Sequence, residues 1–148
     1  SADSGVVQVF TLTGEPAGAR RLPGPPRRVT EADLERARRL YSMGQSAAQQ
    51  RQTREEWALD TPPTTLPAYD ALLVDHEDHL WVRRHPSAGE DLAEWIVFAP
   101  DGAHVATVRL PALLSVHEFG RAYVAGIVQD PVTGTHAVQM WSLTRAPE

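Results

Sequence analysis

The chain has 148 residues, of which 42% are hydrophobic and 22% are charged, and it carries a net charge of −5 at neutral pH. This composition predicts one folded domain with a hydrophobic core and excludes disorder and a disulfide-stapled miniprotein. The absence of cysteine also excludes thiol catalysis and cysteine-ligated zinc. We expect no membrane span, because no apolar run approaches the roughly 20 residues that cross a bilayer. The cellular compartment is left open, since the sequence begins without an initiator Met, as a processed or shortened chain would, and no targeting signal can be read from it.

The charge is unevenly distributed along the chain. Nine arginines and five acidic residues give residues 1–54 a net charge of +4, whereas five arginines and fourteen acidic residues give residues 55–148 a net charge of −9. The basic half has few aromatic residues between its arginines, and several of them flank a Pro/Gly run. We therefore expect solvated loop and helix charges there and no nucleic-acid partner.

The first predicted element is a hairpin over residues 6–22. A β-branched and aromatic run at 6–12 is followed by the turn residues Thr13, Gly14 and Glu15, and a second short strand ends near Leu22. The segment PGPP at 23–26 then ends any strand pairing, because proline donates no backbone hydrogen bond.

A helical segment is predicted over residues 30–59. Thr30 precedes Glu31 and Asp33, which is the pattern of an N-cap with acidic residues in the first turn. Apolar side chains then recur with helical spacing, and a second, more polar helical stretch covers residues 46–59.

The remainder of the chain reads as short strands separated by polar turns. Four runs within residues 68–109 predict a four-stranded antiparallel meander, at 69–75, 79–84, 94–99 and 104–110. Three more predict a three-stranded meander within residues 113–143, at 113–118, 123–129 and 136–143. The first unit matches the roughly 40 to 50 residues of a propeller blade, so we expect a mainly β fold with an inserted helical segment.

Three stretches resemble the C-terminal end of bacterial six-bladed β-propeller proteins of the NHL and TolB-like type. They are LPAYDALLVDHEDHLWVRR, EWIVFAPDGAHVATVRLP and AVQMWSLTR, and their distinctive parts are the D-x-x-x-x-LWV turn at 75–82 and the VFAPDG turn at 97–102. The resemblance implies a single partial propeller domain with a half blade at 6–22, a full blade at 68–109 and a three-stranded blade at 113–143. Members of this group include calcium-dependent lactonases, phosphotriesterases and many binding or scaffold modules. None of their catalytic residues can be matched to a position here.

Such a partial propeller predicts self-association. A fragment with an incomplete last blade exposes sheet edges and faces, so we expect a dimer or trimer in which residues 6–12 pair beside 136–143, within one chain or between chains.

Histidines provide the candidate chemical site. If the predicted turns lie at one end of the blades, they bring His76, His79 and His117 together, with Glu77 near enough to act as a general base. A divalent metal such as Zn²⁺ is the cofactor that this grouping would hold. The spacing of the segment DHEDH is not diagnostic of a metal site, and an ordinary polar turn held by Asx-type hydrogen bonds explains it better.

Tryptophans suggest packing more than ligand binding. Trp81, Trp95 and Trp141 each lie within an apolar strand, so we expect contacts between blades in preference to sugar stacking.

Two functions are consistent with these observations. The first is a β-propeller-derived binding or scaffold domain that self-associates to complete its sheets and takes a small-molecule or protein ligand of unknown identity. The second is a small metal-dependent hydrolase of esters, lactones or phosphoesters that uses the His-rich end of the blades.

Overall fold

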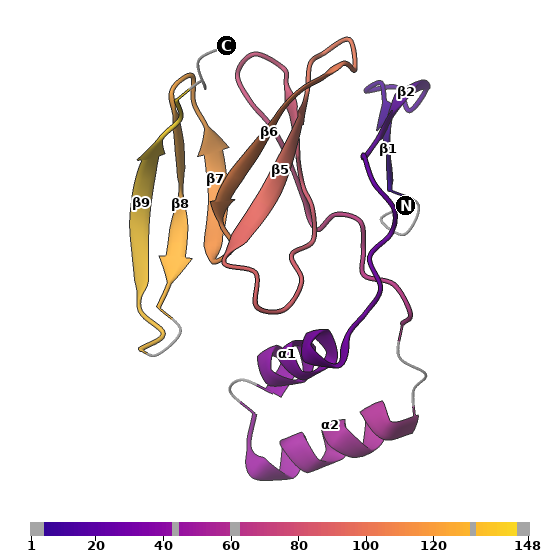
Figure 1. Cartoon of the computed structure of the whole chain (residues 1–148), viewed down its shortest axis with the longest axis vertical. Coiled ribbons are helices and arrows are strands. Elements are labelled where there is room, and N and C mark those ends of the chain that lie inside the picture. The colour runs from indigo at the N-terminus through magenta and orange to yellow at the C-terminus, as the bar shows by residue number, and fades with distance from the viewer. Residues whose placement is uncertain (1–4, 43–44, 60–62, 131–132, 145–148) are drawn as a thin grey trace.

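The computed structural model describes residues 5–42, 45–59, 63–130 and 133–144. In this part of the chain two helices separate a β-hairpin from seven further strands, and they lie together at one end of the molecule (Figure 1). The elements are, in chain order, β1 (Val6–Phe10), β2 (Pro16–Arg21), α1 (Glu31–Ser42), α2 (Ala47–Leu59), β3 (Ala71–Val74), β4 (Leu80–Arg83), β5 (Leu92–Phe98), β6 (His104–Pro111), β7 (Leu114–Phe119), β8 (Tyr123–Gln129) and β9 (His136–Ser142).

The strands form three antiparallel sheets in which sequence neighbours pair. These are the hairpin β1–β2, the four-stranded middle sheet β3–β4–β5–β6 and the three-stranded last sheet β7–β8–β9. The prediction of a mainly β fold with a helical insert is confirmed. The arrangement is compatible with a partial β-propeller.

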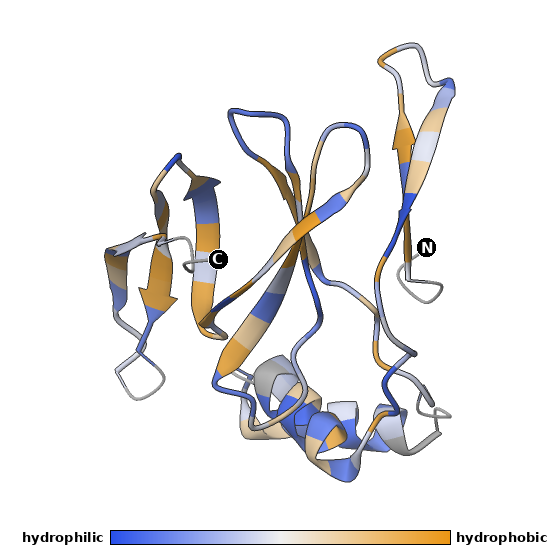
Figure 2. Ribbon diagram, turned by 45° about the horizontal axis from the view of Figure 1, so that its top comes forward, coloured by the Kyte–Doolittle hydropathy of each residue, from blue (hydrophilic) through white to orange (hydrophobic). Residues whose placement is uncertain are grey.

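The centre of the middle sheet is covered on both faces. On one face, Trp81, Trp95 and Val97 pack with Leu114 and Phe119 of the last sheet. The alternation of side chains along a strand sends Val82, Ile96 and Phe98 to the opposite face, where they pack against Val7 and Leu22 of the hairpin segment. Apolar bands along the strands mark these contacts (Figure 2).

Aromatic stacking joins the middle sheet to the last sheet. The rings of Trp81 and Phe119 are stacked with centroids 3.8 Å apart, and Trp95 meets the same Phe119 ring edge-on at 5.0 Å. The expectation of packing between sheets therefore holds for Trp81 and Trp95, which are 8% and 1% exposed. Trp141 differs, because it lies on the edge strand β9 and is 43% exposed.

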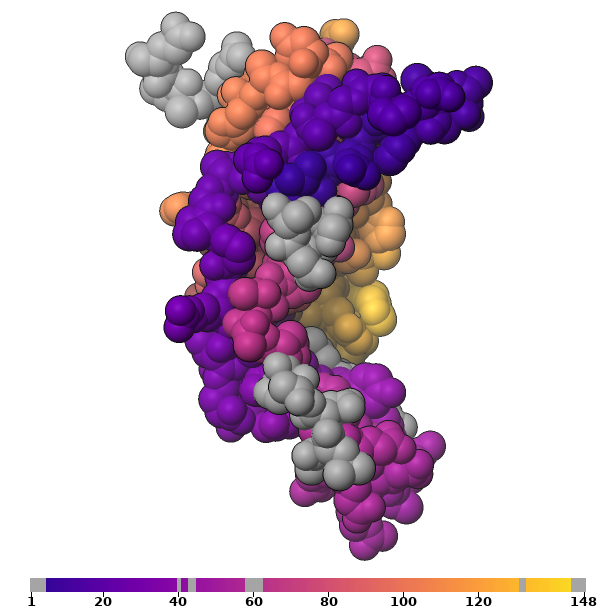
Figure 3. Space-filling model, turned by 90° about the vertical axis from the view of Figure 1, so that its right-hand side faces the viewer, coloured from indigo at the N-terminus to yellow at the C-terminus, as the bar shows by residue number. Residues whose placement is uncertain are grey.

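The hairpin lies on the opposite side of the middle sheet from β9. It crosses one end of the molecule, while the helices occupy the other end (Figure 3). Strand β1 pairs with β2 through the register Val6 to Arg21, and β9 pairs with β8. The expected pairing of residues 6–12 with 136–143 inside one chain is thus not formed, because the middle sheet separates the two segments.

Helix α1 begins at the predicted cap. Thr30 and Asp33 bond reciprocally, with Thr30 N–H donating to Asp33 Oδ2 at 2.9 Å and Asp33 N–H donating to Thr30 Oγ1 at 3.3 Å. The two helices contact each other through Tyr41 and Trp57, whose ring centroids are 5.7 Å apart.

Candidate functional site

The turn between β3 and β4 is organised by the Asp75 carboxylate. Its Oδ1 accepts the backbone N–H groups of Glu77 and His79, each at 2.9 Å, and its Oδ2 accepts the indole N–H of Trp81 at 2.9 Å. The His79 ring also approaches this carboxylate, with Nδ1 3.2 Å from Oδ2. The interpretation of DHEDH as an Asx-type turn is confirmed.

These contacts set the acidity of Asp75. Desolvation raises the pKa of the Asp75 carboxyl, but the hydrogen bonds from Trp81 and from the backbone of His79 and Glu77 outweigh it and hold the pKa below its ordinary value. The carboxylate therefore stays charged in the folded protein and stabilises a turn that touches the Trp81 ring.

His76 and Glu77, two more of the predicted site residues, lie in this turn and form separate ion pairs. His76 Nε2 lies 3.6 Å from Glu118 Oε1, and Glu77 Oε1 lies 3.3 Å from Arg121 Nε. Glu118 also accepts the Tyr123 hydroxyl at 2.6 Å, a bond that lowers the pKa of Glu118 and raises the pKa of Tyr123. The turn that follows β3 thus adjoins the turn that follows β7, as the sequence predicted.

The structure does not gather these histidines around a common point. His117 is exposed at the β-bulge of β7, while His79 and His76 face different carboxylates. Within residues 5–42, 45–59, 63–130 and 133–144, no group of three or more His, Asp or Glu side chains is arranged to hold a metal ion. The metal site at His76, His79 and His117 with Glu77 as base stays a prediction.

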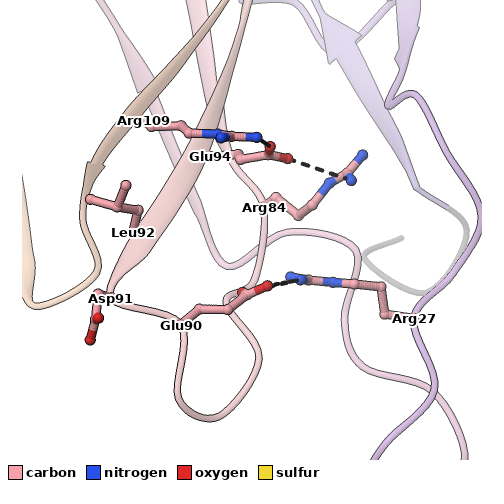
Figure 4. A pocket seen from close by; sticks show the side chains of 7 residues that line it. All are labelled: Arg27, Arg84, Glu90, Asp91, Leu92, Glu94 and Arg109. Carbon is pink, nitrogen blue, oxygen red and sulfur yellow. Dashed lines mark hydrogen bonds and ion pairs between the residues drawn. The ribbon is translucent and has the colours of Figure 1, made fainter.

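A charged cleft lies at the other end of the middle sheet. Glu94 and Arg109, a directly paired couple on β5 and β6, share the sheet face with Ile96 and Phe98, but the hairpin covers only the latter half of this face. The uncovered half borders a cavity of about 380 Å³ (Figure 4). Its lining consists of Arg27, Arg84, Glu90, Asp91, Leu92, Glu94 and Arg109.

Glu94 is shared by two arginines in this cleft. Its Oε1 accepts Arg109 Nη2 at 3.1 Å, and its Oε2 lies 3.7 Å from Arg84 Nη1. The Arg84 guanidinium is also fixed by the hairpin segment, because its Nη2 donates a hydrogen bond to the carbonyl of Pro23. Arg27 Nη1 donates to both carboxylate oxygens of Glu90, at 3.0 and 3.1 Å.

The loop that carries Glu90 is fastened to helix α1. Ala88 N–H donates to the buried Asp33 carboxylate at 2.6 Å, and Arg36 donates to the carbonyl of Ser87 at 3.3 Å. Within the loop, Ser87 N–H donates to Glu90 Oε2 at 2.7 Å. Desolvation raises the pKa of Asp33, but its hydrogen bonds from Thr30 and Ala88 outweigh it and the pKa lies below its ordinary value. The helical insert thereby positions one wall of the cleft.

Sequence reasoning missed this cleft. The sequence around Arg27 predicts a solvated loop charge, and nothing in the pattern places Arg27 beside Glu90, which lies 63 positions further along the chain. One signal was available, since opposite charges at positions 94 and 109 face each other in the predicted meander.

The last sheet leaves one face exposed. On this outer face, which we define by Ala125, Ile127, Val138 and Met140, the β9 residues Val138 and Met140 are 82% and 71% exposed. They pair across the strands with Ile127 and Ala125. The opposite face holds Leu114, Phe119 and the other residues that pack on the middle sheet.

Comparison with protein-family models, with curated proteins and with solved structures finds no match to this chain. Among the residues that the structure describes, no helix is both long and apolar enough to cross a membrane.

Proposed function

We propose that this protein is a β-propeller-derived binding and scaffold domain that self-associates through the outer face of its last sheet. The observation that carries the proposal is the exposure of Val138 and Met140 on β9, the edge strand of the regular antiparallel last sheet. Apolar patches with a polar rim typically mark interaction surfaces, and burying such a patch stabilises a complex by about 25 cal/mol per Å².

A second copy of the chain is the partner that best fits this face. The chain already packs three of its own sheets face to face through strand side chains of the same kind. The outer face repeats that apolar alternation, and its ionisable neighbours are Glu118, which pairs with Ala125 on the β7 side, and His136 at the start of β9. Stacking on another copy would complete the last sheet in the way that the middle sheet is completed within one chain.

Native mass spectrometry and light scattering over a range of micromolar concentrations test the proposal. We expect the unaltered chain to form a dimer or trimer and Val138→Glu to be monomeric, because the new carboxylate would have to be desolvated in the contact. Val105→Glu is the matched control, since Val105 is also an exposed strand valine (53%) but lies on the edge strand β6 of the middle sheet.

A monomeric unaltered chain, or a Val138→Glu variant that keeps the same subunit number, would contradict the proposal. The same spectra report the mass of bound metal. A stoichiometric metal that is lost in His79→Ala would instead support the metal-dependent alternative.

A further inference from the structure

Positive charge is in excess at the Glu94 end of the charged cleft. Arg27 is paired with Glu90, and the Asp91 carboxylate is directed away from the other charged side chains (Figure 4). Around Glu94, the two guanidinium groups of Arg84 and Arg109 share one carboxylate, which leaves one positive charge uncompensated there. A cleft of this kind attracts a compact anion.

The arginine donors are only partly used. Glu94 receives one hydrogen bond from Arg109, whose side chain is 68% exposed, and its contact with Arg84 at 3.7 Å is an ion pair beyond hydrogen-bond distance. A guanidinium offers five N–H donors in a planar fork. Arg109 in particular can turn a pair of parallel donors toward a planar anion without giving up Glu94.

A second cavity with a proline-rich wall adjoins the charged one. It has a volume of about 560 Å³ and shares Arg27 and Arg84 with the charged cavity. The rest of its lining includes one further arginine, Arg21, and an apolar wall formed by Leu22, Pro23, Pro25, Pro26 and Pro67. Both volumes fall in the range of small-molecule sites, which is about 300 to 1,000 Å³.

We infer that the two cavities form one site for a small organic acid, with its carboxylate at Arg84 and Arg109 and its apolar body against the proline-lined wall. A carboxylate matches the single uncompensated charge and the planar fork of Arg109. A phosphate dianion fits less well, because Glu90 and Glu94 border the same space and would repel the second negative charge. The inference does not depend on self-association, since the site lies on the face of the middle sheet that is turned away from the last sheet.

Titration of the full chain with 3-phenylpropanoate, followed by calorimetry and NMR at low ionic strength, tests the site. Its neutral amide has the same shape without the charge, acetate has the charge without the apolar body, and phenyl phosphate carries the dianion. We expect 3-phenylpropanoate to bind, and to bind about tenfold or more tightly than each of the other three.

Variants connect the binding to the cleft. Arg109→Met should weaken binding of 3-phenylpropanoate about tenfold or more, because it removes the exposed fork. Arg121→Met is the matched control, since Arg121 is likewise an exposed arginine paired with one glutamate, Glu77, but lies outside the lining of either cavity. It should bind as the unaltered chain does, and thermal unfolding should show that both variants are folded.

Several results would overturn the inference. They are equal binding of the acid and the amide, equal binding of acetate, tighter binding of phenyl phosphate, no binding by the unaltered chain, or unchanged binding by a folded Arg109→Met. Loss of binding in Arg121→Met would also count against it. Subunit number measured on the same samples separates these outcomes from a failure of the proposed self-association.

Discussion

The middle sheet and the last sheet are built from similar strands but are buried differently. The centre of the middle sheet is covered on both faces, so Val82, Trp95 and Ile96 are at most 1% exposed. The last sheet has Val124 fully buried on its inner face and Val138 82% exposed on its outer face. An apolar strand pattern thus predicts two sheet faces that need a cover, and the described part of the chain covers only the inner face of the last sheet.

The largest effect should come from the covered sheet. We expect Trp95→Ala to lower the free energy of unfolding by about 3–5 kcal/mol, because it empties the space between the two sheets beside Phe119. Trp141→Ala, on the partly exposed edge strand, should cost less than about 1 kcal/mol. Urea denaturation measures both, and a similar loss in the two variants would contradict the difference in burial.

The two faces of the last sheet can be compared with one matched pair of substitutions. Val124→Thr places a hydroxyl where no solvent reaches and should cost about 1–3 kcal/mol. Val138→Thr places the same hydroxyl on the outer face and should change the stability of the monomer by less than about 0.5 kcal/mol. Unfolding is best measured at protein concentrations low enough for the chain to be monomeric. Equal losses would show that the outer face is covered even then.

Acid should weaken the contact between the two sheets at the Asp75 turn. The pKa of Asp75 is lowered in the folded state, so its carboxylate stabilises the fold above the ordinary pKa of 3.8, and this contribution is lost as the pH falls through the lower folded value. We expect Asp75→Asn to lose about 1–2 kcal/mol at pH 7, and its deficit relative to the unaltered chain to shrink below about pH 3.8. Unfolding curves recorded at both pH values, with tryptophan fluorescence reporting on Trp81, would contradict this by a deficit that does not depend on pH.

The smallest effect concerns the ion pair between the turns of the two sheets. Arg121→Met removes the contact with Glu77, but the Arg121 side chain is 87% exposed. We expect a change in stability below about 0.5 kcal/mol, measured by thermal unfolding. A larger loss would mean that this pair helps to hold the middle sheet to the last sheet.

The local signals of the sequence predicted the elements well. Alternating apolar residues placed both meanders, Thr30 marked the start of α1, and Asp75 marked an Asx-type turn. Each of these depends on side chains and backbone groups a few residues apart, so the pattern carries the necessary information. The hypothesis of a metal site at the histidines requires their side chains to converge on one point, which depends on contacts between turns far apart in the sequence. The structure places His76 and His79 beside different carboxylates.

Local patterns in the sequence thus specify the mainly β class, the helical insert and the chemistry of caps and turns. The folded arrangement sets which sheet faces are covered and which charges meet. The pairing of Arg27 with Glu90 joins a loop before α1 to a loop after β4, and Val138 is exposed because, in the described part of the chain, the hairpin packs on the middle sheet and not on the outer face. Both follow from how sheets stack in space, which side-chain alternation allows in more than one way.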